Sequence, residues 1–178
     1  MNLGQRIMVM GNSGGAGKST LARRLGEQLN LPVVHGDVLG HQLGWVPFPK
    51  DEVEQAFFAA AAQPAWVIEG EYRSCAFEYR LERADTMIFL DINVMVCLYR
   101  ALKRRVSYSS KARPCKPEGT VEQISWQFLS AVLARRTLKR RKTQILARLA
   151  EIEPPKQVFH LKGRRAAKNF LAELEQTP

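Results

Sequence analysis

The segment Gly11-Asn12-Ser13-Gly14-Gly15-Ala16-Gly17-Lys18-Ser19-Thr20 lies between a short apolar run, Arg6 to Met10, and an amphipathic stretch that begins at Lys18. Glycines let a backbone wrap around a phosphate group so that its amide N–H groups point inward, and a following helix adds its positive end. The segment therefore predicts a nucleotide-phosphate-binding loop made of Asn12, Ser13, Gly14, Gly15, Ala16, Gly17, Lys18, Ser19 and Thr20.

The end of this loop predicts the chemistry of the bound group. In such loops the lysine reaches the β- and γ-phosphates and the next hydroxyl coordinates Mg²⁺, so Lys18 and Ser19 indicate ATP with Mg²⁺. Five residues separate Gly11 from Gly17, where the usual pattern has four. Either Asn12 takes the place of the first glycine, because asparagine tolerates left-handed backbone, or the loop bulges by one residue.

The rest of the chain alternates apolar runs with amphipathic stretches, which is typical of βα units and a parallel sheet. We predict a three-layer α/β fold of the P-loop type with a five-stranded parallel sheet, in one domain spanning residues 1–178. The expected strands are 6–10, 32–35, 66–68, 86–90 and 157–161, and the expected helices are 18–29, 51–62, 93–106, 121–149 (with a break near Arg136) and 164–175.

Three acidic residues, Asp37, Glu69 and Asp91, directly follow expected strands. Ligands of open parallel sheets bind at the carboxyl ends of the strands, where Lys18 also lies. A carboxylate there can hold magnesium or accept the proton of an attacking hydroxyl. We predict catalytic roles for Asp37 and Glu69, with Ser19 and Glu69 as magnesium ligands; each acid also has the simpler interpretation of a turn residue or helix cap.

Composition and charge limit the class of protein. An apolar share of 46% and a charged share of 25% are typical of a soluble protein, no apolar run is long enough to cross a membrane, and no apolar targeting segment opens the sequence. Three scattered cysteines form no disulfide framework or metal motif, so we expect a cytoplasmic protein. No heptad pattern is sustained, and a monomer is expected.

The positive charge is concentrated in one segment. The net charge of +10 arises from residues 100–148, which carry 14 Lys and Arg against two Glu. Inside this segment, residues 107–120 form a long loop with proline and glycine breakers, which predicts a basic lid. Arg113 is the loop residue that we expect to act on the nucleotide; a solvated helix face is the alternative for the cations that follow.

Several motifs resemble those of adenylate kinases, and the order of the motifs is most similar to a group of small bacterial proteins known as topology modulation protein FlaR. The matching stretches are Gly-Asp-Val-Leu at 36–39, Gly-Trp-Val-Pro at 44–47, Ile-Glu-Gly-Glu-Tyr-Arg at 68–73, Arg-Ala-Asp-Thr-Met-Ile-Phe-Leu-Asp at 83–91 and Cys-Leu-Tyr-Arg-Ala-Leu-Lys-Arg-Arg at 97–105. This resemblance implies a nucleoside-monophosphate-kinase-like fold with a helical, basic lid at about 104–121 and an acceptor-side region at about 36–66.

The resemblance also implies residue roles. Arg100 would stack on the adenine, Arg104 would contact ATP phosphates, and Arg73 would contact the acceptor or the transferring phosphoryl group. The chain departs from adenylate kinases in two places: Gly40 stands where they have an arginine that binds the AMP phosphate, and Glu69 stands where they have aspartate.

These observations favour ATP-dependent phosphoryl transfer to a small molecule or a nucleotide. A nucleic-acid-binding P-loop ATPase that regulates DNA topology is the alternative, because a basic segment also fits a phosphodiester backbone. No helix-turn-helix or aromatic RNA-binding motif supports it. A protein that binds nucleotide without transferring phosphate is a third interpretation, supported by the extra loop residue and by Gly40.

Overall fold

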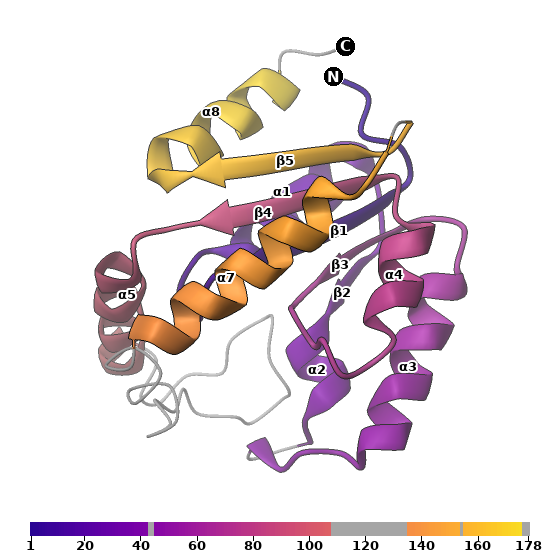
Figure 1. Cartoon of the computed structure of the whole chain (residues 1–178), viewed down its shortest axis with the longest axis horizontal. Helices are drawn as coiled ribbons and strands as arrows, with labels where there is room; N and C mark the ends of the chain where they lie inside the picture. Colours follow the sequence, from indigo (N-terminus) through magenta and orange to yellow (C-terminus); the bar gives the residue numbers. More distant parts are fainter. Residues whose placement is uncertain (43–44, 108–134, 154, 176–178) are drawn as a thin grey trace.

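The computed structural model describes residues 1–42, 45–107, 135–153 and 155–175, without the side chains of 104–107 and 135–137. Its centre is a parallel sheet of five strands in the order β2-β3-β1-β4-β5 (Figure 1). The strands are β1 Arg6–Gly11, β2 Val33–His35, β3 Trp66–Glu69, β4 Thr86–Asp91 and β5 Gln157–Lys162.

Helices cover both faces of the sheet (Figure 1). Alternate residues of the strands point to opposite faces, so each face has its own apolar cluster. α1 and α8 pack on one face, whereas α3, α4 and α7 pack on the other. The helices are α1 Lys18–Leu29, α2 Gly36–Gly40, α3 Lys50–Ala62, α4 Phe77–Arg83, α5 Val94–Ser107, α7 Arg135–Ala150 and α8 Gly163–Glu175.

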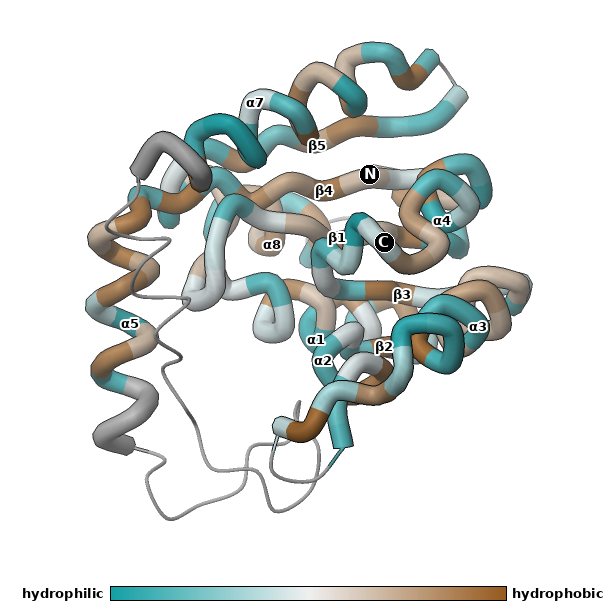
Figure 2. The backbone as a smooth tube through the Cα atoms, turned by 60° about the horizontal axis from the view of Figure 1, so that its bottom comes forward, coloured by the Kyte–Doolittle hydropathy of each residue, from teal (hydrophilic) through white to brown (hydrophobic). Residues whose placement is uncertain are grey.

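The central strands are apolar because both of their faces are buried. Ile7 and Val9 of β1 face α1, while Met8 and Met10 face the other layer. The strands β3 and β4 are also buried, and Figure 2 shows brown, apolar segments along both of them. Parallel pairing places the carboxyl ends of β1, β2 and β3 at one edge, with Val9 beside Glu69 and His35 beside Glu69. The side chains that follow these strands are therefore brought together.

The predicted α/β class and the five-stranded parallel sheet are confirmed. The short helices α2 and α4 were not predicted, because five and seven residues are too few to show a helical apolar period. Of the helix expected at 121–149, the described part is α7, and the break expected near Arg136 cannot be compared because residues 108–134 lie outside the described part. Among the described helices, none is long and apolar enough to span a membrane.

A fully buried arginine fixes the loop between β3 and α4. Arg80 of α4 is 0% exposed and stacks on the ring of Phe57, with 4.4 Å from its guanidinium carbon to the ring centroid. Its guanidinium donates hydrogen bonds to the backbone carbonyl oxygens of Gly70, Glu71, Tyr72, Cys75 and Ala76. Burial lowers the pKa of Arg80 to about 10, so the group remains charged at neutral pH.

The loop that Arg80 holds contains unfavourable backbone conformations. Tyr72 and Ala76 have φ angles of 26° and 48°, in a region that residues with a Cβ rarely adopt. Such conformations persist where the surroundings over-determine them. Here the hydrogen bonds from Arg80 hold the backbone in these conformations, and they therefore fix the position of Tyr72.

Replacing Arg80 by methionine keeps much of the side-chain volume but leaves these carbonyl groups without their donor. We expect the free energy of unfolding to fall by about 2–4 kcal/mol, because several buried acceptors lose a charged donor together. Arg23→Met is the control, since Arg23 lies on the exposed face of α1 in an i,i+4 pair with Glu27, and should cost about 0.5 kcal/mol or less. Urea unfolding monitored by circular dichroism measures both; equal losses would contradict the role given to Arg80.

Candidate active site

The carboxyl ends of the strands open onto a cavity of about 350 Å³. The glycine-rich loop forms one wall, and the residues that follow β2 and β3 form the other. Its lining residues are Gly14, Gly15, Gly17, Lys18, Ser19, Thr20, Asp37, Glu69, Gly70, Glu71 and Tyr72. The structure thus brings together Lys18, Ser19, Asp37 and Glu69, which the sequence analysis had selected from three separate segments.

The loop is held against α5 and the end of β4. Gly15 has a φ angle of 87°, and a Cβ atom there would lie 2.4 Å from the carbonyl oxygen of Cys97, so only glycine fits. Asn12 donates its backbone N–H to the carbonyl oxygen of Leu90 (3.1 Å) and its side-chain amide to that of Ile92 (2.7 Å). Asn12 is not among the described residues with positive φ, so it does not use the left-handed backbone that was the reason to place it at the first glycine's position.

The lysine and the hydroxyl predicted to bind phosphate and magnesium lie at the floor of the cavity. The Nζ atom of Lys18 donates to the carbonyl oxygen of Ser13 at 3.2 Å, within the loop itself. The Oγ atom of Ser19 donates to Oε1 of Glu69 at 2.9 Å. Because the Ser19 proton points to Glu69, the lone pairs of its oxygen are directed elsewhere.

Glu69 is the most enclosed acid of the cavity, with an exposed fraction of 3%. Its Oε1 atom also lies 3.1 Å from Nδ1 of His35, the last residue of β2. Burial raises the pKa of Glu69, but the hydrogen bond from His35, the charge of Lys18 and the hydrogen bond from Ser19 together lower it. Glu69 is thus ionised at neutral pH, and since a carboxylate only accepts hydrogen bonds, Nδ1 of His35 carries a proton.

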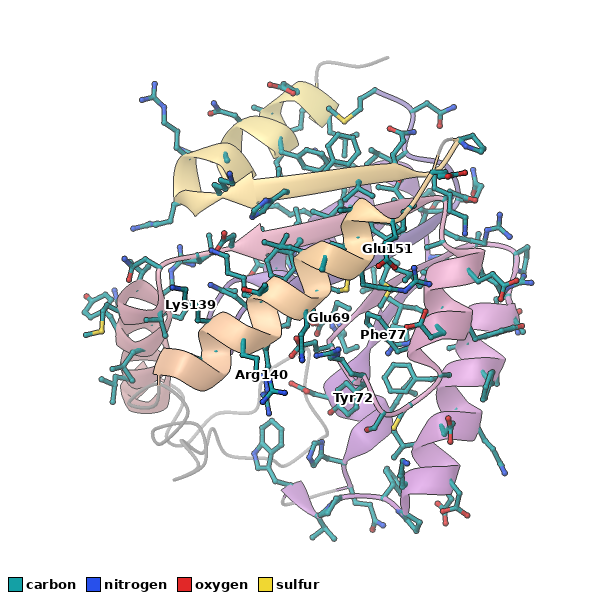
Figure 3. The ribbon with its side chains drawn as sticks, in the orientation of Figure 1. Glu69, Tyr72, Phe77, Lys139, Arg140 and Glu151 are labelled. Carbon is teal, nitrogen blue, oxygen red and sulfur yellow. The ribbon has the colours of Figure 1, made fainter. Side chains whose placement is uncertain are left out.

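A second set of polar groups forms the opposite wall of the cavity. Tyr72 donates its hydroxyl to Oδ1 of Asp37 at 3.1 Å, and the same hydroxyl lies 3.3 Å from Nδ1 of His41. Burial and the negative charge of Glu69 raise the pKa of Tyr72, so it stays protonated. Figure 3 shows Glu69 and Tyr72 on the same side of α7. Tyr72 was not selected from the sequence as a site residue.

The aromatic ring of Tyr72 occupies the space next to Gly40. A Cβ atom on Gly40 would lie 2.6 Å from both Cε1 and the hydroxyl oxygen of Tyr72. Any larger residue at position 40 would displace the ring and its hydrogen bond to Asp37. At position 40, where adenylate kinases have an arginine, the Tyr72 ring therefore occupies the space that a side chain would need.

Two of the arginines predicted for the site, Arg73 and Arg100, do not line this cavity. Arg73 is exposed, and its Nη1 atom donates to Oε1 of Gln144 on α7 at 2.9 Å. Arg100 of α5 places Nη1 at 3.3 Å from the carbonyl oxygen of Gly15. The side chain of Arg104 and the whole of Arg113 lie outside the described part of the chain, as do residues 108–121 of the expected lid.

Asp91, the third acid that follows a strand, has structural partners. Its Oδ2 atom lies 2.7 Å from Nζ of Lys142 on α7 and 2.9 Å from Nε2 of His160 on β5. Its Oδ1 atom accepts a hydrogen bond from Asn12 at 3.3 Å. Burial raises the pKa of Asp91, but the hydrogen bonds from Lys142 and His160 lower it. The residue joins α7 to the base of the loop and does not line the cavity.

A larger cavity of about 930 Å³ lies on the other side of the loop. It lies between α1, α5 and α8, with Leu21, Leu90, Ile92 and Leu171 as apolar residues. Six cationic side chains line it and no acidic one does among the described residues. These cations are Arg24, Arg100, Lys103, Arg164, Arg165 and Lys168.

Magnesium sites built wholly from protein need several acidic ligands, whereas magnesium bound with a triphosphate uses one or two protein oxygens. Among the described residues, no three His, Cys, Asp or Glu side chains gather as a metal site. The pair of Ser19 and Glu69 oxygens, 2.9 Å apart beside Lys18, fits the second kind of site.

Comparison with known proteins identifies the fold. No protein-family model matches the chain, and no curated protein matches it in sequence. Among solved structures, a shikimate kinase from Acinetobacter baumannii in complex with shikimate matches with a TM-score of 0.53 and 20% identity, over 97% of this chain and 92% of that one. A sugar kinase from Janibacter sp. HTCC2649 (TM-score 0.48, 16% identity, 98% and 96% covered) and a gluconokinase from Sinorhizobium meliloti 1021 (0.45, 19%, 83% and 99%) also match.

The scores of the last two lie below 0.5, so the assignment of fold depends on the shikimate kinase. With the parallel sheet and the flanking helices, it establishes an α/β fold similar to that of this shikimate kinase. The narrower resemblance to the FlaR-like group is not confirmed by these comparisons.

Replacing Glu69 by glutamine should lower the free energy of unfolding at pH 7 by about 1–3 kcal/mol, because a charged acceptor of two buried hydrogen bonds is lost. The pKa of Glu69 is lowered by folding, so its ionised form stabilises the native state above the unfolded pKa of about 4.3. That contribution disappears as the pH falls through the folded pKa, and the two proteins should then converge. Glu27→Gln, on the exposed face of α1, is the control. Unfolding by urea between pH 7 and pH 3 measures the difference; a gap independent of pH would contradict this account.

Proposed function

We propose that the chain is a phosphotransferase that moves the γ-phosphoryl group of ATP to a small-molecule or nucleotide acceptor. The observation that carries the proposal is the cavity of about 350 Å³ in which the loop, Lys18 and Ser19 face Asp37 and Glu69. Phosphoryl transfer requires positioning and charge neutralisation at the transferring group, together with a carboxylate near the attacking atom. The cavity has residues of each type on opposite walls.

The phosphate side is assigned to the loop. The loop amides and Lys18 bind the β- and γ-phosphates, and Ser19 with Glu69 holds Mg²⁺, directly or through water. Magnesium, when bound, supplies positive charge to the phosphate oxygens. Arg100 and the apolar residues of the larger cavity take the nucleoside, since this cavity adjoins the loop at Gly15, Ala16 and Gly17.

The acceptor side is assigned to the wall formed by Asp37 and Tyr72. Asp37 orients the attacking group and accepts its proton, and Tyr72 positions Asp37 through the 3.1 Å hydrogen bond. We assign the whole chain to one kinase-like domain, with a lid at about 104–121 and an acceptor-side region at about 36–66. In this proposal Arg73, Arg104 and Arg113 approach the phosphates when the lid closes over the site.

Lys18→Ala should abolish transfer and weaken ATP binding by at least about tenfold, because the charge that faces the phosphates is lost. Asp37→Asn should lower turnover by about 10²–10⁴-fold with little change in ATP affinity, because it removes the proton acceptor. Lys50→Ala, at the exposed start of α3, is the control and should behave as the wild type.

The measurement is transfer from γ-labelled ATP with Mg²⁺ to a panel of nucleoside monophosphates, nucleosides and hydroxylated metabolites, with ATP affinity from calorimetry. Transfer that survives in Lys18→Ala would contradict the proposal. Fast hydrolysis of ATP that no acceptor redirects would do the same.

The larger cavity also supports a second candidate, a nucleic-acid-dependent ATPase. Six cations without a carboxylate among the described lining residues fit any polyanion, including a phosphodiester backbone. In the kinase proposal these cations attract the nucleotide, and the protein binds DNA weakly.

Replacing Arg164, Arg165 and Lys168 together by glutamine separates the two candidates. From the kinase proposal we expect the Kd for ATP to rise several-fold, and no DNA binding below about 10 μM at physiological salt. Fluorescence anisotropy with labelled single- and double-stranded DNA over a range of salt concentrations measures this. Tight binding with a steep salt dependence, lost in the triple variant, together with ATP hydrolysis stimulated by DNA, would favour the second candidate.

A further inference from the structure

The two oxygens of the buried Glu69 carboxylate have different surroundings. The Oε1 atom accepts a hydrogen bond from Oγ of Ser19 at 2.9 Å and lies 3.1 Å from Nδ1 of His35. Among the described residues, no donor reaches the Oε2 atom. Glu69 is 3% exposed and lines the cavity. A buried carboxylate oxygen needs a donor, a cation or a bound water, so Oε2 indicates a group that enters the cavity.

The contact between His35 and Glu69 is determined by the pairing of two strands. In the parallel register of β2 and β3, His35 is the direct neighbour of Glu69, and the two strands lie side by side in Figure 1. Just after His35, a Cβ atom on Gly36 would lie 2.8 Å from the backbone carbonyl oxygen of Glu69, so a larger residue would push the two chains apart. The backbone thus holds the imidazole beside the carboxylate.

His35 and Ser19 restrain the carboxylate from different parts of the fold. A glutamate side chain has several rotatable bonds, and an unrestrained one loses rotamer freedom when it binds a ligand. Two donors that converge on Oε1 fix the orientation of the carboxylate before anything binds. Ser19 belongs to the loop and α1, whereas His35 belongs to the sheet. His35 therefore supplies the restraint that does not depend on the loop.

The simpler interpretation of this contact is that His35 only stabilises a buried charge during folding. The two interpretations differ in what they predict for metal binding. Removing a partner that orients a metal-binding carboxylate typically weakens metal binding by about 10- to 100-fold. A residue that only stabilises the fold has no such effect on the protein that remains folded.

We propose that His35 is a positioning residue for the metal ion of the nucleotide complex: its Nδ1–H group holds Oε1 of Glu69 and so leaves Oε2 for Mg²⁺ or for one of its waters. This inference rests on the phosphotransferase function proposed above, in which Ser19 and Glu69 hold Mg²⁺. The Nδ1 atom of His35 carries a proton and therefore does not coordinate the metal itself.

Replacing His35 by asparagine and by leucine tests the position of the donor. The side-chain nitrogen of asparagine is bonded to Cγ, as Nδ1 of histidine is, so His35→Asn retains the donor, whereas His35→Leu removes it. Calorimetry with β,γ-imido-ATP, an analogue that resists hydrolysis, gives one Kd with Mg²⁺ and another with EDTA. The Kd in EDTA divided by the Kd with Mg²⁺ measures the coupling between metal and nucleotide. Glu69→Gln gives this ratio when the carboxylate is lost.

We expect the wild type to bind the analogue more tightly with Mg²⁺ than in EDTA. In His35→Leu the ratio should fall by about tenfold, toward that of Glu69→Gln, while the Kd in EDTA stays within about threefold of the wild type. In His35→Asn the ratio should stay within about threefold of the wild type. His160→Leu is the matched control and should leave the ratio unchanged, because Nε2 of His160 lies 2.9 Å from the carboxylate of Asp91, which does not line the cavity.

Three results would overturn this inference and leave the proposed function intact. The first is a wild-type ratio in His35→Leu. The second is an equal loss in His35→Asn and His35→Leu, since the donor at the position of Nδ1 would then not matter. The third is a tenfold weaker binding of the analogue by His35→Leu in EDTA, which would reveal a general structural role. Failure of the wild type to bind the analogue, or binding that does not respond to Mg²⁺, would instead overturn the proposed function, and this inference with it.

Discussion

The buried carboxylate of Glu69 is the constraint on which the site depends. A charge with 3% exposure at the end of a strand is tolerable only if hydrogen bonds and opposite charge replace the lost water. The hydrogen bonds come from Ser19 at the start of α1 and from His35 at the end of β2, and the opposite charge comes from Lys18, also at the start of α1. One side chain thus fixes the glycine-rich loop relative to two strands, and the cavity acquires its floor as a consequence.

The second wall depends on a different kind of constraint. A loop with positive φ angles at Tyr72 and Ala76 would relax if it were held only by its ends. Arg80 holds this loop through hydrogen bonds to five of its backbone carbonyl oxygens, and its side chain is buried between α3 and α4. The stability of the core and the shape of the wall that contains Tyr72 therefore depend on the same side chain, although Arg80 does not line the cavity.

Local patterns in the sequence predicted the glycine-rich loop, Asp37 and Glu69, but they did not predict Tyr72. The strand, glycine loop and helix from Arg6 to Leu29 are consecutive, and each residue type indicates its own conformation. Asp37 and Glu69 could be placed beside Lys18 because the ends of parallel strands share one edge. The position of the Tyr72 ring over Gly40 depends on a φ angle of 26° at Tyr72 and on the buried Arg80, eight residues later. Neither of these can be predicted from the hydrophobic periodicity of the sequence. Arg73 has the expected spacing, but in this structure it contacts α7.

The contact between Gly40 and Tyr72 also restricts how this site can diverge between related sequences. Each of the two residues depends on the other. A side chain at position 40 would clash with the Tyr72 ring, and the ring can occupy its present position only while position 40 is glycine. A lineage that changes both residues must then pass through an intermediate that is strained or has a void, unless both codons change together. We expect positions 40 and 72 to vary as a pair among homologues.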